Sequence, residues 1–108
     1  MTPEEEYEVH TNAECAEGLL AVPDYMRGGM VRYILHGIMP GDFLQHVLSG
    51  DLFGALRKAD DTNFYILQDY GLFLFNYAPA ECFGSGKQVV EWSLRGGLLR
   101  TGRGGNDT

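Results

Sequence analysis

The sequence predicts an all-α protein, a small single-domain bundle of about four to five helices. Apolar residues recur at spacings of three and four over long stretches, which is the period of one helix face. Glycine, proline and capping residues separate these stretches at short intervals. The 108 residues and the apolar share of 44% fit one domain with one core.

The N-terminal segment carries most of the net charge of −7. Residues 1–29 hold seven acids and one base, a balance of −6, whereas residues 30–108 hold eight acids and seven bases, a balance of −1. Residues 1–21 also lack a clear apolar period, so we predict a flexible or partner-ordered acidic arm there. The arm is not expected to bind nucleic acid, because phosphates attract Lys and Arg.

The chain has neither the pattern of a signal peptide nor that of a membrane span. Its start is acidic where a signal peptide is basic and then apolar. Its longest apolar run is far shorter than the ~20 residues that cross a bilayer. We therefore expect a cytoplasmic location.

The first helix of the bundle is predicted from about Pro23 to Leu35. Proline is favoured in a first helical turn, and Gly37 suits the left-handed turn that ends a helix. One apolar face is formed by Met26, Met30, Tyr33 and Ile34.

Two further helices are predicted before residue 59. One begins at Pro40 and continues through Leu48, and a short one resumes at Leu52. Ser49 or Asp51 is expected to cap the short helix by accepting backbone N–H bonds.

The third long helix is predicted from the cluster at residues 59–63 to about Tyr77. Its apolar residues cover much of the helix circumference, which is typical of a central helix. The run from Tyr70 to Phe75 also suits a strand, but the length of the pattern favours a helix. Pro79 ends it, because the residue before proline resists the helical region.

A last helix is predicted over Lys87–Leu94, with Ser85 as its N-cap and Gly96 at its end. The chain then divides into an acidic arm over residues 1–21, a helical domain over 22–98 and a flexible Gly-rich tail over 99–108.

No polar cluster forms a complete catalytic or cofactor motif. Asp60, Asp61 and Asn63 could hold a metal, but helix capping explains them and the distant Glu of a calcium loop is missing. Residues 84–87 resemble part of a phosphate loop, but lack its second Gly, its following Ser or Thr and its strand. Cys15 and Cys82 are expected to be reduced thiols. We predict no catalytic residue, cofactor or metal, and hence no enzyme.

The histidines are also scattered. His46 has Asp42 one helical turn away, and such a pair can tune a proton acceptor. His36 precedes the turn at Gly37, and no nucleophile accompanies either histidine. Solvation or helix capping is the expected role of both.

Aromatic residues are in surplus, with six Tyr, six Phe and one Trp. A small core cannot easily bury all of them, and interfaces use Tyr and Trp as anchors. We therefore predict that some meet a partner protein or a second copy of the chain. The predicted contacts combine the acidic arm with exposed aromatics: Glu4, Glu5, Glu6, Glu8, Tyr65, Tyr77 and Trp92.

A series of short strings is spread over residues 23–98: Tyr33-Ile34, His36-Gly37-Ile38, Pro40-Gly41, Phe43-Leu44, Val47-Leu48, Asp51-Leu52, residues 59–63, residues 75–79, Gly84-Ser85, Trp92 and Gly96-Gly97-Leu98. In these strings the chain resembles a widespread group of short uncharacterised proteins encoded by bacteriophages and prophages of proteobacteria. The resemblance implies a phage origin, and small acidic phage proteins without catalytic motifs often bind a host protein.

The function that we expect is inhibition of a bacterial defence system by direct protein–protein binding, with a Cas surveillance complex as the first target, as in anti-CRISPR proteins. Two alternatives stay open. One is an oligomeric sponge for a nucleotide signal, bound at the helix starts near Asp60 or Ser85. The other is a phage assembly or host-modulating factor.

Overall fold

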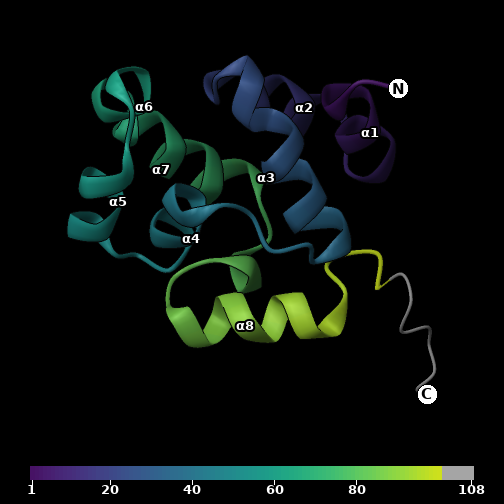
Figure 1. Ribbon diagram of the computed structural model, residues 1–108. Helices are drawn as coiled ribbons and strands as arrows, with labels where there is room; N and C mark the ends of the chain where they lie inside the picture. Colours follow the sequence, from purple (N-terminus) through teal and green to yellow (C-terminus); the bar gives the residue numbers. More distant parts are fainter. Residues whose placement is uncertain (101–108) are drawn as a thin grey trace.

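The computed structural model describes residues 1–100 and forms this part of the chain entirely from helices and loops, which confirms the all-α class. It has eight α-helices rather than four to five, because the N-terminal segment is helical and the predicted long helix is divided. With two short 3₁₀ helices, the order in Figure 1 is α1 (Pro3–His10), α2 (Ala13–Gly18), η1 (Leu19–Ala21), α3 (Asp24–His36), α4 (Asp42–Leu48), α5 (Leu52–Lys58), α6 (Asp61–Tyr65), α7 (Leu67–Tyr77), η2 (Ala80–Cys82) and α8 (Gly86–Arg95).

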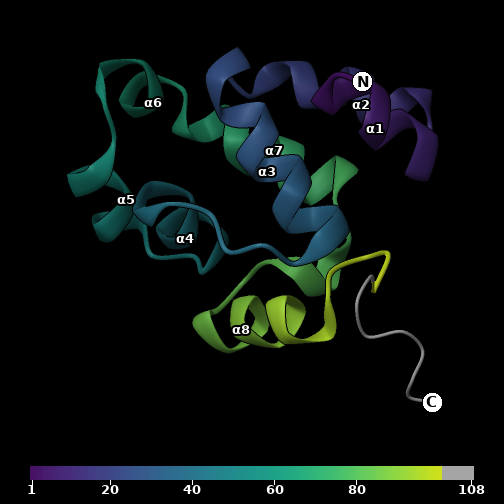
Figure 2. The ribbon, with the colours of Figure 1, turned by 45° about the vertical axis from the view of Figure 1, so that its right-hand side comes forward.

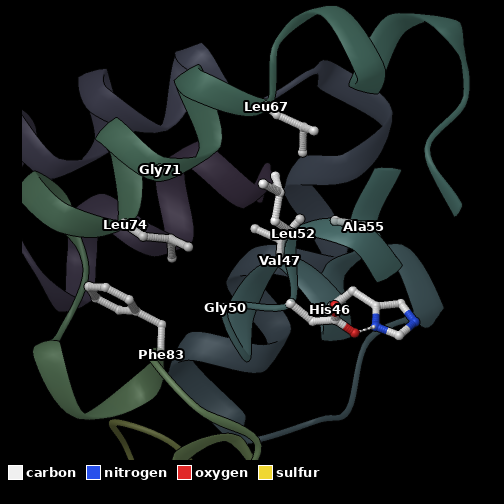
Figure 3. A pocket seen from close by; sticks show the side chains of 10 residues that line it. His46, Val47, Gly50, Leu52, Ala55, Leu67, Gly71, Leu74 and Phe83 are labelled. Atoms are coloured by element: carbon white, nitrogen blue, oxygen red, sulfur yellow. Dashed lines mark hydrogen bonds and ion pairs between the residues drawn. The ribbon is translucent and has the colours of Figure 1, made fainter. Parts of the chain in front are cut away.

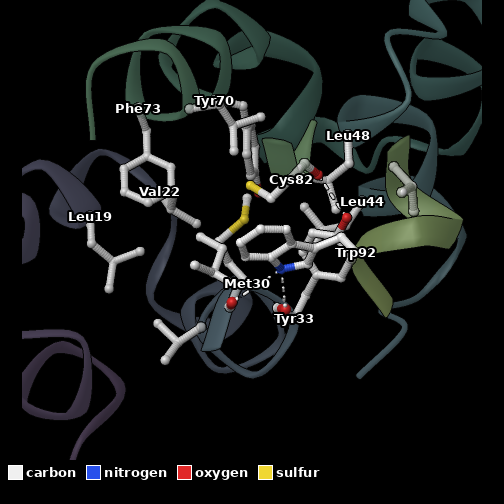
Figure 4. Packing of buried hydrophobic residues seen from close by; sticks show 14 of the residues in the cluster. Leu19, Val22, Met30, Tyr33, Leu44, Leu48, Tyr70, Phe73, Cys82 and Trp92 are labelled. Carbon is white, nitrogen blue, oxygen red and sulfur yellow. Dashed lines mark hydrogen bonds between the residues drawn. The ribbon is translucent and has the colours of Figure 1, made fainter. Parts of the chain in front are cut away.

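Helix α3 lies at the centre of the core. Its bounds are close to those predicted for the first helix, and Gly37 ends it with φ 73°, as predicted. Five of its residues are buried, and Figure 4 shows Met30 and Tyr33 packed among side chains of α4, α7, η2 and α8. The Tyr33 hydroxyl donates a 2.6 Å hydrogen bond to the Cys82 carbonyl, which ties the centre of α3 to η2.

The prediction of a flexible arm over residues 1–21 is wrong, because this segment folds as α1, α2 and η1. Thr2 and Glu5 form a capping box that starts α1. Tyr7 is completely buried, with its ring beside Phe73 and its hydroxyl donating to a carbonyl of α7. Leu19 is also buried, so the segment belongs to the core although most of its residues are polar.

The start of α4 differs from the prediction, whereas the start of α5 agrees with it. Gly41 is the N-cap of α4, so Pro40 lies before the helix, where its carbonyl accepts a 2.7 Å bond from the Gln45 side chain. Asp51 caps α5 by accepting a 2.9 Å bond from the Gly54 N–H. Ser49 instead ends α4.

The long helix predicted from the cluster at residues 59–63 to about Tyr77 is divided at Ile66. Asp60 is the N-cap, as expected, but the Ile66 N–H bonds to the Asn63 carbonyl in a tight turn that closes α6. The Asn63 side chain is buried and accepts a 2.6 Å bond from the Tyr70 hydroxyl, which fixes α6 against α7. Helix α7 then ends at Tyr77 before Pro79, as predicted.

Helix α8 completes the bundle beside the end of α3. Ser85 caps it and Gly96 ends it with φ 89°, both as predicted. The N–H groups of Leu98 and Leu99 then donate to the carbonyls of Ile34 and Leu35. The predicted tail over residues 99–108 therefore begins with a bonded residue, and its positions 101–108 lie outside the described part of the chain.

The molecule is elongated, with extents of 42 × 29 × 20 Å. Figures 1 and 2 place α5 and α6 at one end and α1 at the other. Helix α7 runs between them, because it follows α6 directly and its last residue, Tyr77, packs against Gly18 of α2. Helix α7 therefore connects the end formed by α5 and α6 to the helices of the N-terminal segment.

Candidate functional site

Three of the four glutamates predicted to contact a partner already have partners within the chain. Glu4 Oε2 lies 2.8 Å from Arg27 Nη1, and Glu6 Oε2 lies 2.9 Å from His36 Nε2. Glu5 bonds Thr2 in the capping box. The pKa of the Glu4 carboxyl lies below its usual range, because the backbone N–H of Glu4 and the Arg27 guanidinium both bond to it. This carboxylate therefore stays ionised at neutral pH. The contacts with Arg27 and His36 join α1 to α3.

The fourth glutamate, Glu8, is exposed to solvent. It belongs to a group of exposed carboxylates on α1, α2 and the start of α3, which we call the acidic end: Glu5, Glu8, Glu14, Glu17 and Asp24. Arg27, the one Lys or Arg in residues 1–29, lies within 4 Å of Glu4 and Asp24. Because α1 and α2 are folded, the acidic end presents its charge on a rigid surface.

The three predicted aromatic contacts lie in different environments. Tyr65 is 83% exposed. Tyr77 is half-buried with its ring against Gly18, where an added Cβ would come within 2.2 Å of the ring. Trp92 is only 2% exposed, and its indole N–H donates to the carbonyls of Tyr33 and Ile34. Trp92 therefore belongs to the core rather than to a surface.

The polar clusters act mainly as helix caps. Asp60 accepts from the Asn63 N–H, and Ser85 accepts from the Gln88 N–H, so the two helix starts considered for phosphate already use N–H groups internally. His46 Nδ1 lies 2.9 Å from Asp51 Oδ2, the acid that caps the next helix. The Gly54 N–H and then His46 lower the pKa of Asp51. Among residues 1–100, no three His, Cys, Asp or Glu side chains converge as metal ligands would.

A mainly apolar groove of about 230 Å³ lies between α4, α5 and α7. In Figure 3, Leu52 and Val47 come from one wall, and Leu67, Leu74 and Phe83 from the other. His46 and Asp51 are the two residues with ionisable side chains in the lining, and they bond each other at the rim. The groove therefore suits an apolar side chain better than a polar ligand.

Gly71 leaves part of this groove open. It lies within α7 without a positive φ, and a Cβ added to it would meet no atom within 4 Å. Neither the backbone nor the packing of the chain therefore requires glycine there. Glycine nevertheless lowers the stability of a helix by about 1 kcal/mol relative to alanine at an interior position.

Large apolar side chains are exposed on α5, α6 and α7: Leu52 (57% exposed), Phe53 (75%), Phe64 (50%), Tyr65 (83%), Leu72 (51%) and Phe75 (79%). The rings of Phe64 and Tyr65 contact each other with centroids 5.2 Å apart. Protein interfaces use large exposed apolar side chains, so the surfaces of these three helices are candidate contact regions.

Sequence reasoning identified one of these exposed residues as a contact, Tyr65, and missed the groove. The signal for the groove was Gly71, a glycine inside an otherwise apolar helix pattern. Which aromatics reach the surface depends on how the helices pack, because each helix is apolar on more than one side.

Comparisons with known proteins identify no relative: no family model, curated protein or solved structure matches the chain. No helix within the described residues has the length and apolar character needed to span a membrane.

Proposed function

We propose that this protein is a phage-encoded inhibitor of a bacterial defence system, which binds its target directly and acts as an anti-CRISPR on a Cas surveillance complex. The observation that carries the proposal is the acidic end, where five exposed carboxylates are held on folded helices. The phage origin and the choice of a Cas complex rest on the resemblance of residues 23–98 to phage and prophage proteins.

A Cas complex offers basic surfaces, because it must hold guide RNA and target DNA through their phosphates. An acidic end with the spacing of its charges fixed by α1 and α2 complements such a surface. Complementary charge raises the association rate and suppresses wrong partners. Occupying the basic surface would exclude nucleic acid and so block the complex without any chemical step.

The test compares two charge-reversed variants against a purified Cas surveillance complex. In Glu8→Lys with Glu17→Lys, both changes lie in last helical turns of α1 and α2, where Lys suits the helix dipole. The matched control is Glu81→Lys with Glu91→Lys, which makes the same charge change at exposed positions far along the chain. We expect the first variant to lower the association rate by about 10-fold and to flatten its salt dependence.

Equal losses in both variants would assign the effect to net charge rather than to the acidic end. Unchanged rates in both would remove the acidic end from binding.

Affinity capture from the bacterial host, with mass spectrometry of the bound proteins, tests the choice of target: recovery of Cas subunits supports it. Recovery of phage structural proteins instead would favour the assembly role. Calorimetry against cyclic nucleotides should give no heat, and binding there would favour the sponge.

A further inference from the structure

A second hollow lies between α3, α4 and the segment that joins these two helices (Figure 2). Its volume of about 330 Å³ falls in the range of small-ligand sites, which begins at about 300 Å³. We call it the Arg32 hollow, and the lining residues that carry the argument are Tyr25, Met26, Gly29, Arg32, Met39 and Leu44. The first four follow one side of α3, because they recur at helical spacing.

Arg32 brings an unbalanced positive charge to this hollow. It is the one lining residue with a charged side chain, and within residues 1–100 its guanidinium has neither an ion pair nor a hydrogen bond. Asp42, which follows the joining segment, lies 3.8 Å from Lys58 Nζ, and Asp60 accepts a hydrogen bond from the Tyr25 hydroxyl. The chain has 15 acids and 8 Lys or Arg residues, so a guanidinium without an acidic partner is unexpected.

Two glycines of α3 shape the hollow around this charge. A Cβ on Gly28 would come 3.0 Å from Arg32 Nη1, so glycine there lets the guanidinium lie close to the helix. A Cβ on Gly29 would meet Leu44 Cδ1 at 3.7 Å, an ordinary contact, and Gly29 has no positive φ. The chain itself therefore accepts a side chain at position 29, although glycine disfavours the helix. Glycine there keeps the hollow wide and lets a ligand approach the backbone.

The chemistry of the lining selects a small aromatic carboxylate. A guanidinium binds a carboxylate through two parallel N–H···O bonds. One guanidinium balances one negative charge, whereas the net charge of −7 repels an anion of several charges. The sulfur atoms of Met26 and Met39 favour contact with an aromatic ring. A single ring fits the volume, because a cavity of about 150 Å³ already admits benzene.

We propose that the Arg32 hollow binds a small aromatic monocarboxylate, with the carboxylate on Arg32 and the ring against Met26 and Met39. The site does not depend on the proposed function, because no carboxylate of the acidic end lines the hollow.

The experiment titrates the isotope-labelled full chain with phenylacetate and follows the amide chemical shifts by NMR. Phenylethanol is the matched ligand, because it keeps the ring and the two-carbon chain but replaces the carboxylate with a neutral alcohol. Phenylacetate should give saturable shifts at the amides of Gly29 and Met39, with a dissociation constant below about 1 mM. Phenylethanol should bind at least about 10-fold more weakly, because it lacks the charged partner for Arg32.

Two variants test the two parts of the site. Arg32→Gln removes the charge, and Gly29→Leu fills the hollow with a residue that favours the helix. Each should raise the dissociation constant of phenylacetate by at least about 10-fold. Arg57→Gln is the control, because it makes the same change at an exposed arginine of α5 outside the hollow. It should leave the affinity unchanged, and circular dichroism must show unchanged helix content in all three variants.

The natural chain alone can overturn the proposal. Phenylacetate that gives no saturable shifts contradicts it, and so does equal affinity for phenylacetate and phenylethanol. An affinity for phenylacetate that stays unchanged in Arg32→Gln or in Gly29→Leu also overturns it. If phenylacetate does not bind but Arg32→Gln loses binding to a host protein, the proposal is overturned and Arg32 belongs to the contact with that protein.

Discussion

At the scale of single residues, Trp92 shows how an aromatic side chain can donate a hydrogen bond to carbonyls near the end of another helix. Its indole N–H lies 3.1 Å from the carbonyls of both Tyr33 and Ile34, in the last turns of α3. Its ring is covered by the core, and the Arg95 guanidinium lies 4.4 Å from the ring centroid on the other side. One side chain thus joins α8 to the centre of the bundle by packing and by hydrogen bonding.

Replacing Trp92 with Phe should lower the free energy of unfolding by about 2 kcal/mol, from the lost donor and the smaller ring. Urea unfolding followed by circular dichroism measures this, since the chain has one Trp and the variant none. Val9→Ala, at a residue that is 64% exposed, should change stability by less than about 0.5 kcal/mol. If Trp92→Phe left the stability unchanged but abolished partner binding, Trp92 would belong to the interface instead of the core.

Residue roles that depend on local chemistry were predictable, and those that depend on packing were not. Asp51, Asp60, Ser85 and Gly37 all cap helices as expected, because a cap is decided by a few neighbouring residues. Tyr65 is 83% exposed whereas Trp92 is 2% exposed, although both were predicted to contact a partner. Only the arrangement of whole helices decides which of them faces solvent.

At the scale of elements, the ends of α3 and α8 meet through two glycines. Gly37 and Gly97 both have positive φ, and a Cβ on Gly37 would come within 2.8 Å of the Gly97 nitrogen. The Ser93 hydroxyl donates a 2.7 Å bond to the Gly37 carbonyl across the same junction. The two helix ends can approach this closely only because neither glycine has a side chain.

Replacing Gly37 with Ala should therefore destabilise the fold by about 2–3 kcal/mol, from the left-handed backbone and the clash together. Thermal unfolding monitored by circular dichroism measures the loss. Gly86→Ala is the control, because a Cβ there meets no atom within 4 Å and the residue is helical. It should be neutral or slightly stabilising. Equal melting temperatures for the two variants would contradict this account of the junction.

Two element-level predictions failed because tertiary contacts outweigh local pattern. Helices α1 and α2 are polar along most of their length, and a few inward residues such as Tyr7 hold them on the core. The pattern over residues 60–77 is continuous in sequence, but the buried pair of Asn63 and Tyr70 accompanies a break at Ile66. Neither contact is visible in the hydrophobic period from which the helices were predicted.

At the scale of the whole molecule, the N-terminal segment is part of the single core. Tyr7 and Leu19 are completely buried, and the Arg27 side chain bonds Glu4 and the carbonyls of Leu20 and Val22. The segment that we propose to bind a partner therefore also stabilises the core, so a truncation would change both properties.

Deleting residues 1–21 should abolish cooperative unfolding rather than only weaken partner binding. Losing a large buried side chain costs about 2–5 kcal/mol, and two are lost from a total stability that is typically 5–15 kcal/mol. A thermal scan and limited proteolysis report the outcome. The Glu8→Lys with Glu17→Lys variant, which changes the surface of the same segment, should keep its melting temperature. A truncated chain that still melts cooperatively would show that α1 and α2 are dispensable.

The junction of α3 with α8 also bears on the order in which the chain folds. Its side-chain hydrogen bonds join residues 56 to 59 positions apart in sequence, whereas the ion pairs between α3 and α1 join residues 23 and 30 positions apart. Longer loops cost more entropy to close, so the N-terminal helices can assemble on α3 before its end is completed. Interactions that form after the rate-limiting step of folding change the unfolding rate and leave the folding rate unchanged. The glycine junction would then slow unfolding, so that it sets how long the native state persists rather than how quickly it forms.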